Sequence, residues 1–141
     1  MKPIITSLLA AIALSTTAFA QDTPPAGGFD LPEICVSEMG KSAASEMPPM
    51  PEVHAMDEAH MALMNGMGQM ETSMMTGMMA SDIDVAFNCA MLPHHQGAIN
   101  MAKAELAHGN DAESKQRAQM IIDAQQKEIA DILAWLEKQP K

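Results

Sequence analysis

Apolar residues recur with a helical period along most of the chain, and no segment shows the strict alternation of a β-strand. The pattern is clearest over residues 111–138, where apolar side chains follow three- and four-residue spacing: Ala118, Ile121, Ile122, Ile129, Ile132, Leu133 and Leu136. Asn110 and Glu113 form a capping box at the start of this segment, and Pro140 lies beyond its end. A long final helix is therefore predicted.

Two more segments have the pattern of helices. Residues 83–107 form a long one, with Asp82 placed to cap its start and Gly109 placed to end it. A shorter helix is predicted over residues 30–43, with Asp30 as its N-cap.

The segment of about residues 52–80 is rich in methionine and has no strand pattern. It contains Met61, Met64, Met67, Met70, Met74, Met75, Met78 and Met79. We expect a helix that Gly66 and Gly68 weaken or interrupt. At about 100° per residue the sulfur atoms cover roughly half of the helix circumference, which is wider than a core stripe, so some of them face solvent or line a groove. The fold predicted is all-α, a small bundle with a short first helix and three longer helices.

The first twenty residues have the pattern of a secretory signal peptide: Lys2, an apolar run from Ile4 to Leu14, and a small–x–small sequence ending at Ala20. The apolar run is shorter than the roughly 20 residues that span a membrane, and no later segment is long enough. The organisation expected is a signal peptide at 1–20, a Pro/Gly-rich lead with the short helix at 21–50, and a His/Met helical domain at 51–139. The mature protein is therefore expected to be periplasmic or secreted.

Charge and methionine content narrow the classes of function. Without residues 1–20 the chain has seven basic and eighteen acidic residues, a net charge of −11, which argues against nucleic acid as a partner because phosphates would be repelled. The sequence has 16 Met beside one Trp, three Phe and no Tyr. A thioether is both a flexible apolar group and a soft metal ligand, so this composition suggests a use for sulfur beyond packing.

The sequence MLPHHQGAINMA, residues 91–102, holds the strongest candidate site. At about 100° per residue, one helix face about 120° wide carries Asp84, Phe87, Met91, His94, His95, Ala98 and Met101. We expect this to be the core face, so that its polar groups need partners or a ligand. Met91 lies about 4.5 Å along the axis from His94 and about 6 Å from His95, within reach of one ion. Met101 lies about 10.5 Å from His94 and belongs to a second site or to the core.

Residues outside this face are expected to support the site. Met64 and Met67 of the Met-rich helix are the expected further sulfur ligands, and His60 is another candidate ligand.

Hydrogen bonds are expected to orient the ligands. Asp84 and Gln125 are the candidate partners of the ligating side chains, and Gln125 would bond to one of the two histidines, or else to water or backbone. Pro93 cannot donate to the carbonyl group four residues back, so we expect a kink that re-aims the histidines.

The ligand set indicates the metal. Thioether and imidazole are neutral, soft donors that favour Cu(I), imidazole also accepts Cu(II), and silver is not distinguished from copper by these ligands. Zinc more often takes Cys, His and carboxylate ligands. A carboxylate di-iron site is the rival, because Glu105 and His108 have its spacing, but the rest of the chain offers only a near match at Asp57 and His60.

Cys35 and Cys89 are the only cysteines. An even pair in an exported protein indicates a disulfide. The alternative is that Cys89 binds copper as a thiolate beside His94. Its direction on the helix, about 160° from Met91, counts against this alternative.

The stretches DVAFNCAMLPHHQGAINMAKAEL (84–106) and QRAQMIIDAQQKEIADILAWL (116–136) resemble the family known as domain of unknown function 305, which includes CopM-like periplasmic copper-binding proteins. The matching residues are Asp84, Phe87, Met91, His94, His95, Gln96, Gly97, Ala98, Met101, Ala102, Gln125, Glu128 and Ile129. The resemblance covers roughly residues 50–138, and neither the lead nor the cysteine pair belongs to its pattern. It implies a ferritin-like four-helix bundle, copper binding in the periplasm and a role in copper tolerance. Ile132 departs from the pattern, which often has Met there.

The sequence thus predicts an exported copper-binding protein that sequesters or transfers copper and is not an enzyme. A copper chaperone or an efflux component is the expected protein partner. The alternatives are a Met-rich helical interaction module without a metal role, because such surfaces repack readily against varied partners, and a copper-dependent redox enzyme.

Overall fold

The computed structural model describes residues 29–46, 48 and 56–140. Every regular element in these residues is helical, which confirms the all-α class. The elements are a 3-10 turn, η1 (Glu33–Cys35), and the α-helices α1 (Glu38–Ser45), α2 (Glu58–Met64), α3 (Met67–Met78), α4 (Ile83–His108) and α5 (Ala112–Leu136). The predicted signal peptide and the start of the lead, residues 1–28, lie outside the described residues.

Carboxylate caps set the starts of the two long helices. Asp82 Oδ1 accepts from two backbone N–H groups of the first turn, both at 3.0 Å, so α4 begins where the sequence predicts. The prediction for α5 was wrong by one residue. Asp111, not Asn110, is its N-cap, and Asp111 Oδ1 accepts from the Ser114 N–H at 2.7 Å. The sequence does not separate the two because both residue types are good caps.

The Met-rich segment forms two helices because Gly66 interrupts it. Gly66 has a φ of 84°, a left-handed conformation that glycine adopts with little strain. Asn65 before it is extended, so α2 ends at Met64 and α3 begins at Met67. Gly68, the other expected weak point, lies inside α3. The predicted start of this segment, residues 52–55, is outside the described residues.

The first predicted helix, over residues 30–43, starts later than expected. Its N-cap is Ser37, whose Oγ accepts from the Gly40 N–H at 3.0 Å, and not Asp30. Residues before it form only the single turn η1, in which the Cys35 N–H donates to the Pro32 carbonyl at 2.8 Å.

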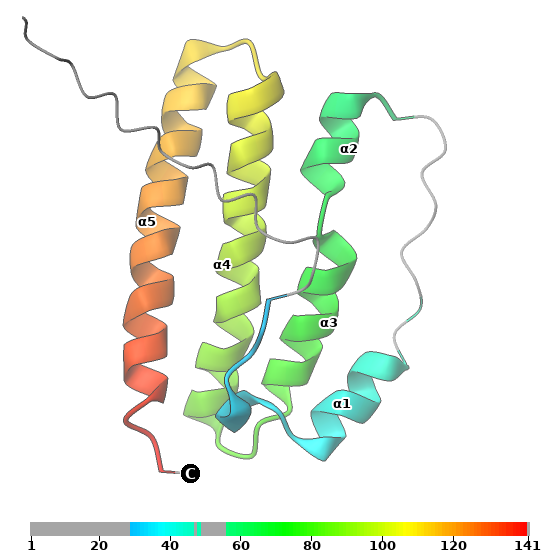
Figure 1. The fold of residues 1–141 in the computed structure, drawn as a ribbon, viewed down its shortest axis with the longest axis vertical. Helices are drawn as coiled ribbons and strands as arrows, with labels where there is room; N and C mark the ends of the chain where they lie inside the picture. The colour runs from blue at the N-terminus through cyan, green and yellow to red at the C-terminus, as the bar shows by residue number, and fades with distance from the viewer. Residues whose placement is uncertain (1–28, 47, 49–55, 141) are drawn as a thin grey trace, which may run out of the picture.

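Helix α4 lies in the middle of the molecule, with α5 along one side and α3 along the other (Figure 1). Helix α2 also packs on α4, beyond the break that separates it from α3, and α1 packs on α3. The segment from Phe29 to η1 crosses one face of this layer, where Phe29, Leu31 and Ile34 pack on the core. The described helices are consistent with a four-helix bundle in which the broken α2–α3 pair occupies one position. None of them is long and apolar enough to cross a membrane.

The core has two parts that lie along the α4–α5 interface. The part next to η1 contains Cys35, Val85, Cys89, Leu92 and Leu136. The part toward the α4–α5 connection contains Ile99, Ala102, Ala118 and Ile122. Small residues at the second part let the two long helices lie close together.

Helices α3 and α4 approach each other at backbone level near Gly77. A Cβ atom added to Gly77 would lie 2.9 Å from the Cys89 carbonyl oxygen and 2.8 Å from its carbon. This carbonyl group is the one that Pro93, four residues later, cannot satisfy with a hydrogen bond. Helix α4 nevertheless runs unbroken through Pro93. At the gap that proline leaves in the hydrogen-bond ladder of α4, the backbone of α3 therefore packs closely.

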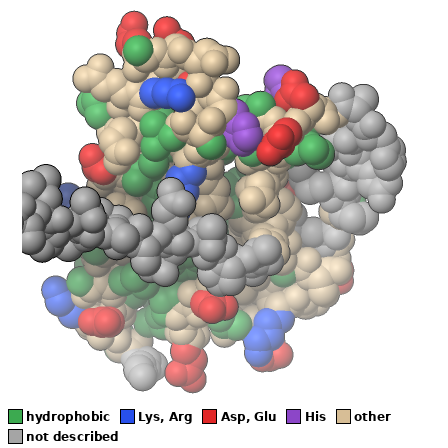
Figure 2. All heavy atoms as spheres, turned by 45° about the horizontal axis from the view of Figure 1, so that its top comes forward, with side chains coloured by type: hydrophobic (Ala, Val, Ile, Leu, Met, Phe, Trp, Pro, Cys, Tyr) green, Lys and Arg blue, Asp and Glu red, His purple; other side chains and the backbone are tan. Residues whose placement is uncertain are grey.

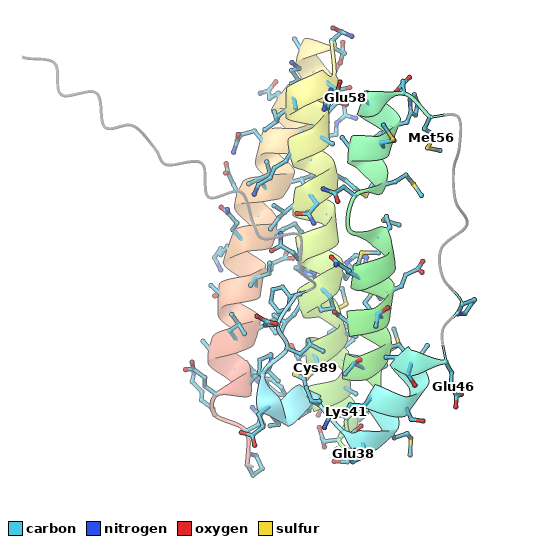
Figure 3. The ribbon with its side chains drawn as sticks, turned by 45° about the vertical axis from the view of Figure 1, so that its right-hand side comes forward. Glu38, Lys41, Glu46, Met56, Glu58 and Cys89 are labelled. Carbon is cyan, nitrogen blue, oxygen red and sulfur yellow. A yellow bond between two sulfur atoms is a disulfide. The ribbon has the colours of Figure 1, made fainter. Side chains whose placement is uncertain are left out.

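The predicted disulfide between Cys35 and Cys89 is present, with a Cα–Cα distance of 5.5 Å. Both cysteines are fully buried, and Cys89 lies on α4 next to η1 (Figure 3). The bond fastens the N-terminal segment to the part of the core next to η1, across 54 residues of sequence. It also leaves neither sulfur as a thiolate, so the alternative of Cys89 as a copper ligand was wrong.

Replacing Gly77 with alanine should destabilise the fold. The new methyl group would meet backbone atoms, which cannot move aside as a side chain can. We expect the free energy of unfolding to fall by about 1–3 kcal/mol, despite the better helix propensity of alanine. Urea unfolding followed by circular dichroism measures this, with Thr72→Ala, at an exposed position of the same helix, as the control. Equal stability of the two variants would contradict the close contact.

Removing the disulfide by Cys35→Ala with Cys89→Ala should also destabilise the protein. A bond that closes 54 residues stabilises by about 4 kcal/mol in the chain-entropy model. Urea unfolding of the double variant should show this loss. Wild-type protein unfolded in the presence of a reducing agent should approach the same urea midpoint as the double variant. If neither the double variant nor the reduced protein differs in midpoint from the oxidised wild type, the bond does not constrain the unfolded chain.

The stability of α5 should depend on pH through Asp111. The Ser114 backbone N–H lowers the pKa of Asp111 below its ordinary value of 3.8 because it donates to the ionised carboxylate. The cap therefore stabilises the fold fully above pH 3.8 and loses its effect as the pH falls through the lower pKa of the folded state. Asp111→Asn keeps a cap that does not titrate. The stability of wild type relative to this variant should fall between about pH 5 and pH 2, and a difference independent of pH would refute the assignment.

Candidate metal centre

Most of the face of α4 that was expected to lie in the core is open, and His95 is the exception. Asp84 and His94 are exposed, Phe87 is 62% exposed and Met101 is 45% exposed, while Met91 is half-buried. The prediction of a core face was therefore wrong. The core side of α4 is apolar through residues such as Leu92 and Ile99, and periodicity alone could not show this, because apolar residues occupy all sides of this helix.

His95 is the member of the pair that enters the core. It is 8% exposed, and its Nε2 lies 2.7 Å from Glu128 Oε2 on α5. Gln125 Nε2 donates to the same oxygen at 3.2 Å. Gln125 thus acts on His95 through Glu128, and not by the direct bond that was one of the sequence-based alternatives. Glu128 itself was not predicted as a site residue, although its spacing of three from Gln125 places both on one side of α5.

The other ring nitrogen of His95, Nδ1, is buried and has no hydrogen-bond partner among the described residues. A carboxylate accepts hydrogen bonds, so Glu128 assigns the proton of the neutral imidazole to Nε2. Nδ1 then carries a lone pair inside the protein. A buried polar atom without a partner costs free energy, and a metal ion is one partner that would satisfy it.

His94 and His95 are consecutive residues on one turn of α4, and His94 is exposed whereas His95 is buried. Their ring centroids are 5.8 Å apart and the ring planes are inclined by 63°. The two rings therefore lie edge to face, as neighbours on the surface of α4. Met91 lies one turn before His95 on the same helix and is half-buried. Met91, His94 and His95 thus lie within about one turn of α4.

The remaining candidate ligands are distributed along the bundle. Met64 ends α2 and Met67 begins α3, and both are half-buried beside the Gly66 break. Met101 lines a separate apolar groove, two turns from His94. Asp84 lies in the first turn of α4, about 15 Å along the axis from His94, so it does not reach the imidazoles.

His60 is engaged in capping α2. Its Nδ1 lies 2.7 Å from Asp57 Oδ1, and its backbone N–H donates to the same oxygen at 2.9 Å. These bonds lower the pKa of Asp57, the backbone N–H being the main cause. The ring keeps Nε2 free for a ligand, but it is exposed and lies on another helix from the histidine pair.

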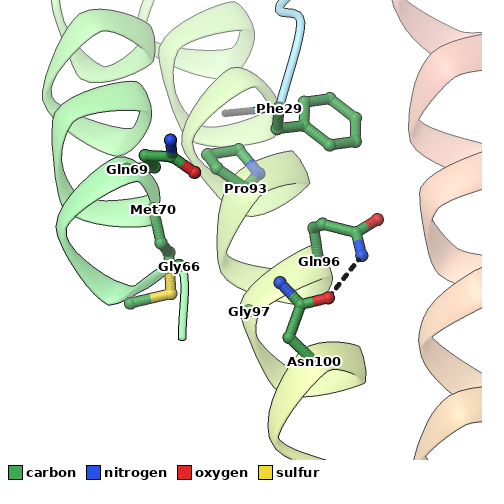
Figure 4. A pocket seen from close by; sticks show the side chains of 8 residues that line it. All are labelled: Phe29, Gly66, Gln69, Met70, Pro93, Gln96, Gly97 and Asn100. Atoms are coloured by element: carbon green, nitrogen blue, oxygen red, sulfur yellow. Dashed lines mark hydrogen bonds between the residues drawn. The ribbon is translucent and has the colours of Figure 1, made fainter. Parts of the chain in front are cut away.

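Gly97 of the His-His-Gln-Gly-Ala run has a packing role. The Met70 sulfur occupies the space that a Cβ atom at residue 97 would need. The same contact borders a small cavity of about 30 Å³ between α3 and α4, near Pro93 (Figure 4). Gln96 Nε2 donates to Asn100 Oδ1 at 3.0 Å at the edge of this cavity. Glycine therefore seats a thioether of α3 directly on the backbone of α4.

Carboxylates do not build a metal site in the described part of the chain. No group of three or more His, Cys, Asp or Glu side chains lies close enough there to hold an ion. Acidic side chains are scattered over the visible face of the molecule, with hydrophobic ones between them (Figure 2). This finding disfavours the di-iron alternative.

The fold and this site define the protein as a disulfide-linked helical bundle with a His/Met face. The chain belongs to the family named Domain of unknown function (DUF305), whose model matches residues 31–136. The match reaches further toward the N-terminus than the motif around His94 suggests, and it includes η1, α1 and Cys35. No curated protein matches the chain.

Proposed function

We propose that this protein binds copper, with Cu(I) favoured, and sequesters or transfers it in copper homeostasis or tolerance. The observation that carries the proposal is the Nδ1 of His95, which is buried and has no partner in the part of the chain that the structure describes. Its neighbours on α4 are a second imidazole and a thioether, which are the donors that Cu(I) prefers. Copper is the cargo here, and silver(I) would occupy the same donors.

The ligands proposed are Met91, His94 and His95, and each has a separate role. His95 supplies Nδ1 from a ring that Glu128 holds in one tautomer. Met91 supplies sulfur one turn away, and exposed His94 is the ligand that incoming copper meets first. Met64, Met67, Met101 and His60 remain candidates for weaker or additional sites.

The set suits binding and release better than catalysis. The three donors are neutral, and thioether does not titrate, so Met91 retains its affinity in acid. We propose no enzymatic activity. The disulfide and the signal-like N-terminus support a location in the periplasm or outside the cell. A copper chaperone or an efflux component would be the partner there. The scaffold that holds the site would be a ferritin-like bundle.

Competition with a Cu(I) chelator of moderate affinity tests the proposal. His95→Ala and His94→Ala should each weaken binding strongly, whereas His108→Ala, at the far end of α4, should not. Glu128→Gln should weaken binding about 10–100-fold, because it loosens the hold on His95 without removing a ligand. The matched control is Glu137→Gln, at an exposed position near the end of α5. Failure of the wild-type protein to compete at all would refute copper binding.

A further inference from the structure

The open face of α4 has the spacing of a helix-packing seam. Its residues alternate at steps of three and four, with Phe87, Met91, His94, Ala98 and Met101 between an acid at each end, Asp84 and Glu105. This is the 3.5-residue period by which two helices pack along one another. Phe87 at one end of the seam is 62% exposed. In this structure the seam therefore has the residues of a packing surface but faces solvent.

Large apolar side chains gather on this side of the molecule. Five of the nine exposed large hydrophobic residues among the described residues lie here: Leu63, Ile83, Phe87, Met101 and Ile121. Leu63, Met101 and Ile121 also line a groove of about 350 Å³ between α2, α4 and α5. Pro93, Gln96 and Asn100 line the cavity beside Phe29. At about 100° per residue they lie on the side of α4 opposite to the residues that line this groove. The N-terminal segment thus packs on one face, and the groove lies on the other.

From this arrangement we infer that a second copy of this chain docks on the open face of α4, antiparallel to the first. Phe87 and Met101 are each seven residues from His94, about 10.5 Å along the helix. A two-fold axis at His94 therefore sets Phe87 of each copy over the Met101 groove of the other. Such a contact is self-complementary, as the interface of a symmetric dimer must be.

Area and charge both favour a second copy. Helix α4 has 26 residues and is about 39 Å long. The open face of the helix, together with half of the groove on each side of it, is about 20 Å wide. The resulting roughly 800 Å² per partner is the size of a standard stable interface. The chain carries a net charge of −10, yet residues 85–102 on α4 contain no Asp, Glu, Lys or Arg. The middle of this face is therefore uncharged, and like charges meet only at its two ends.

The docking has a consequence for the proposed copper site, and that consequence alone rests on the proposed function. The two His94 rings meet near the axis, so docking covers the exposed ligand of both copies. Asp84 of each copy approaches Glu105 of the other, two like charges at the ends of the seam. Added salt screens this repulsion, and association therefore strengthens as ionic strength rises.

Sedimentation equilibrium of metal-free protein comprising residues 21–141 tests the docking. We expect a dimer over about 5–200 µM protein, tighter in about 0.5 M than in about 0.05 M salt. Phe87→Glu should raise the dissociation constant at least about tenfold. Met39→Glu, a matched change at a side chain 69% exposed on α1, should leave it unchanged.

A monomeric wild-type protein at the highest concentration and salt would overturn the proposal, and so would a dimer that Phe87→Glu leaves intact. Circular dichroism of Phe87→Glu distinguishes loss of docking from loss of folding, and Ala98→Glu at the centre of the seam provides a second variant with the same expected loss. Neither result depends on copper, so the docking and the copper site are tested separately.

Discussion

The backbone of Cys89 is where the parts of this molecule are joined. Its carbonyl lacks a helical donor because of Pro93, and Gly77 of α3 packs on that group at backbone distance. Its side chain is bonded to Cys35, which brings the N-terminal segment onto the same point. Leu92 and Leu136 complete the surrounding core. Three segments distant in sequence thus fix the rotation of α4 about its own axis, and that rotation decides which side chains are buried and which face solvent.

Much of the fold can be predicted from the sequence because its signals are local. The carboxylate at Asp82 starts α4 and the glycine at Gly66 breaks the Met-rich segment, each through the conformation of one or two residues. The same local logic fails where two residues offer the same chemistry, as at Asn110 and Asp111. It also fails for the first helix, where an Oγ cap at Ser37 overrides the earlier candidate Asp30.

Which side of α4 is buried could not be predicted from the sequence, for a physical reason. Spacing on a helix shows which residues share a face, so Met91, His94 and His95 could be grouped, but it does not show which face meets another helix. Helix α4 is apolar on nearly all sides, and alanine and glycine, rather than the large side chains, mark the side toward α3. Glu128 was overlooked because a charged residue in an exposed position has the pattern of a solvated face. Its role appears only once α5 lies against His95.

The two histidines illustrate how adjacent residues acquire different chemistry. One step along a helix turns the side chain by about 100°, which here carries His95 into the core and leaves His94 in solvent. The buried ring has its tautomer set by Glu128 and cannot turn freely, so it offers one lone pair in one direction. The exposed ring is free to rotate toward an incoming ion. A site with one fixed and one mobile imidazole can capture an ion from solution and hold it against a rigid donor.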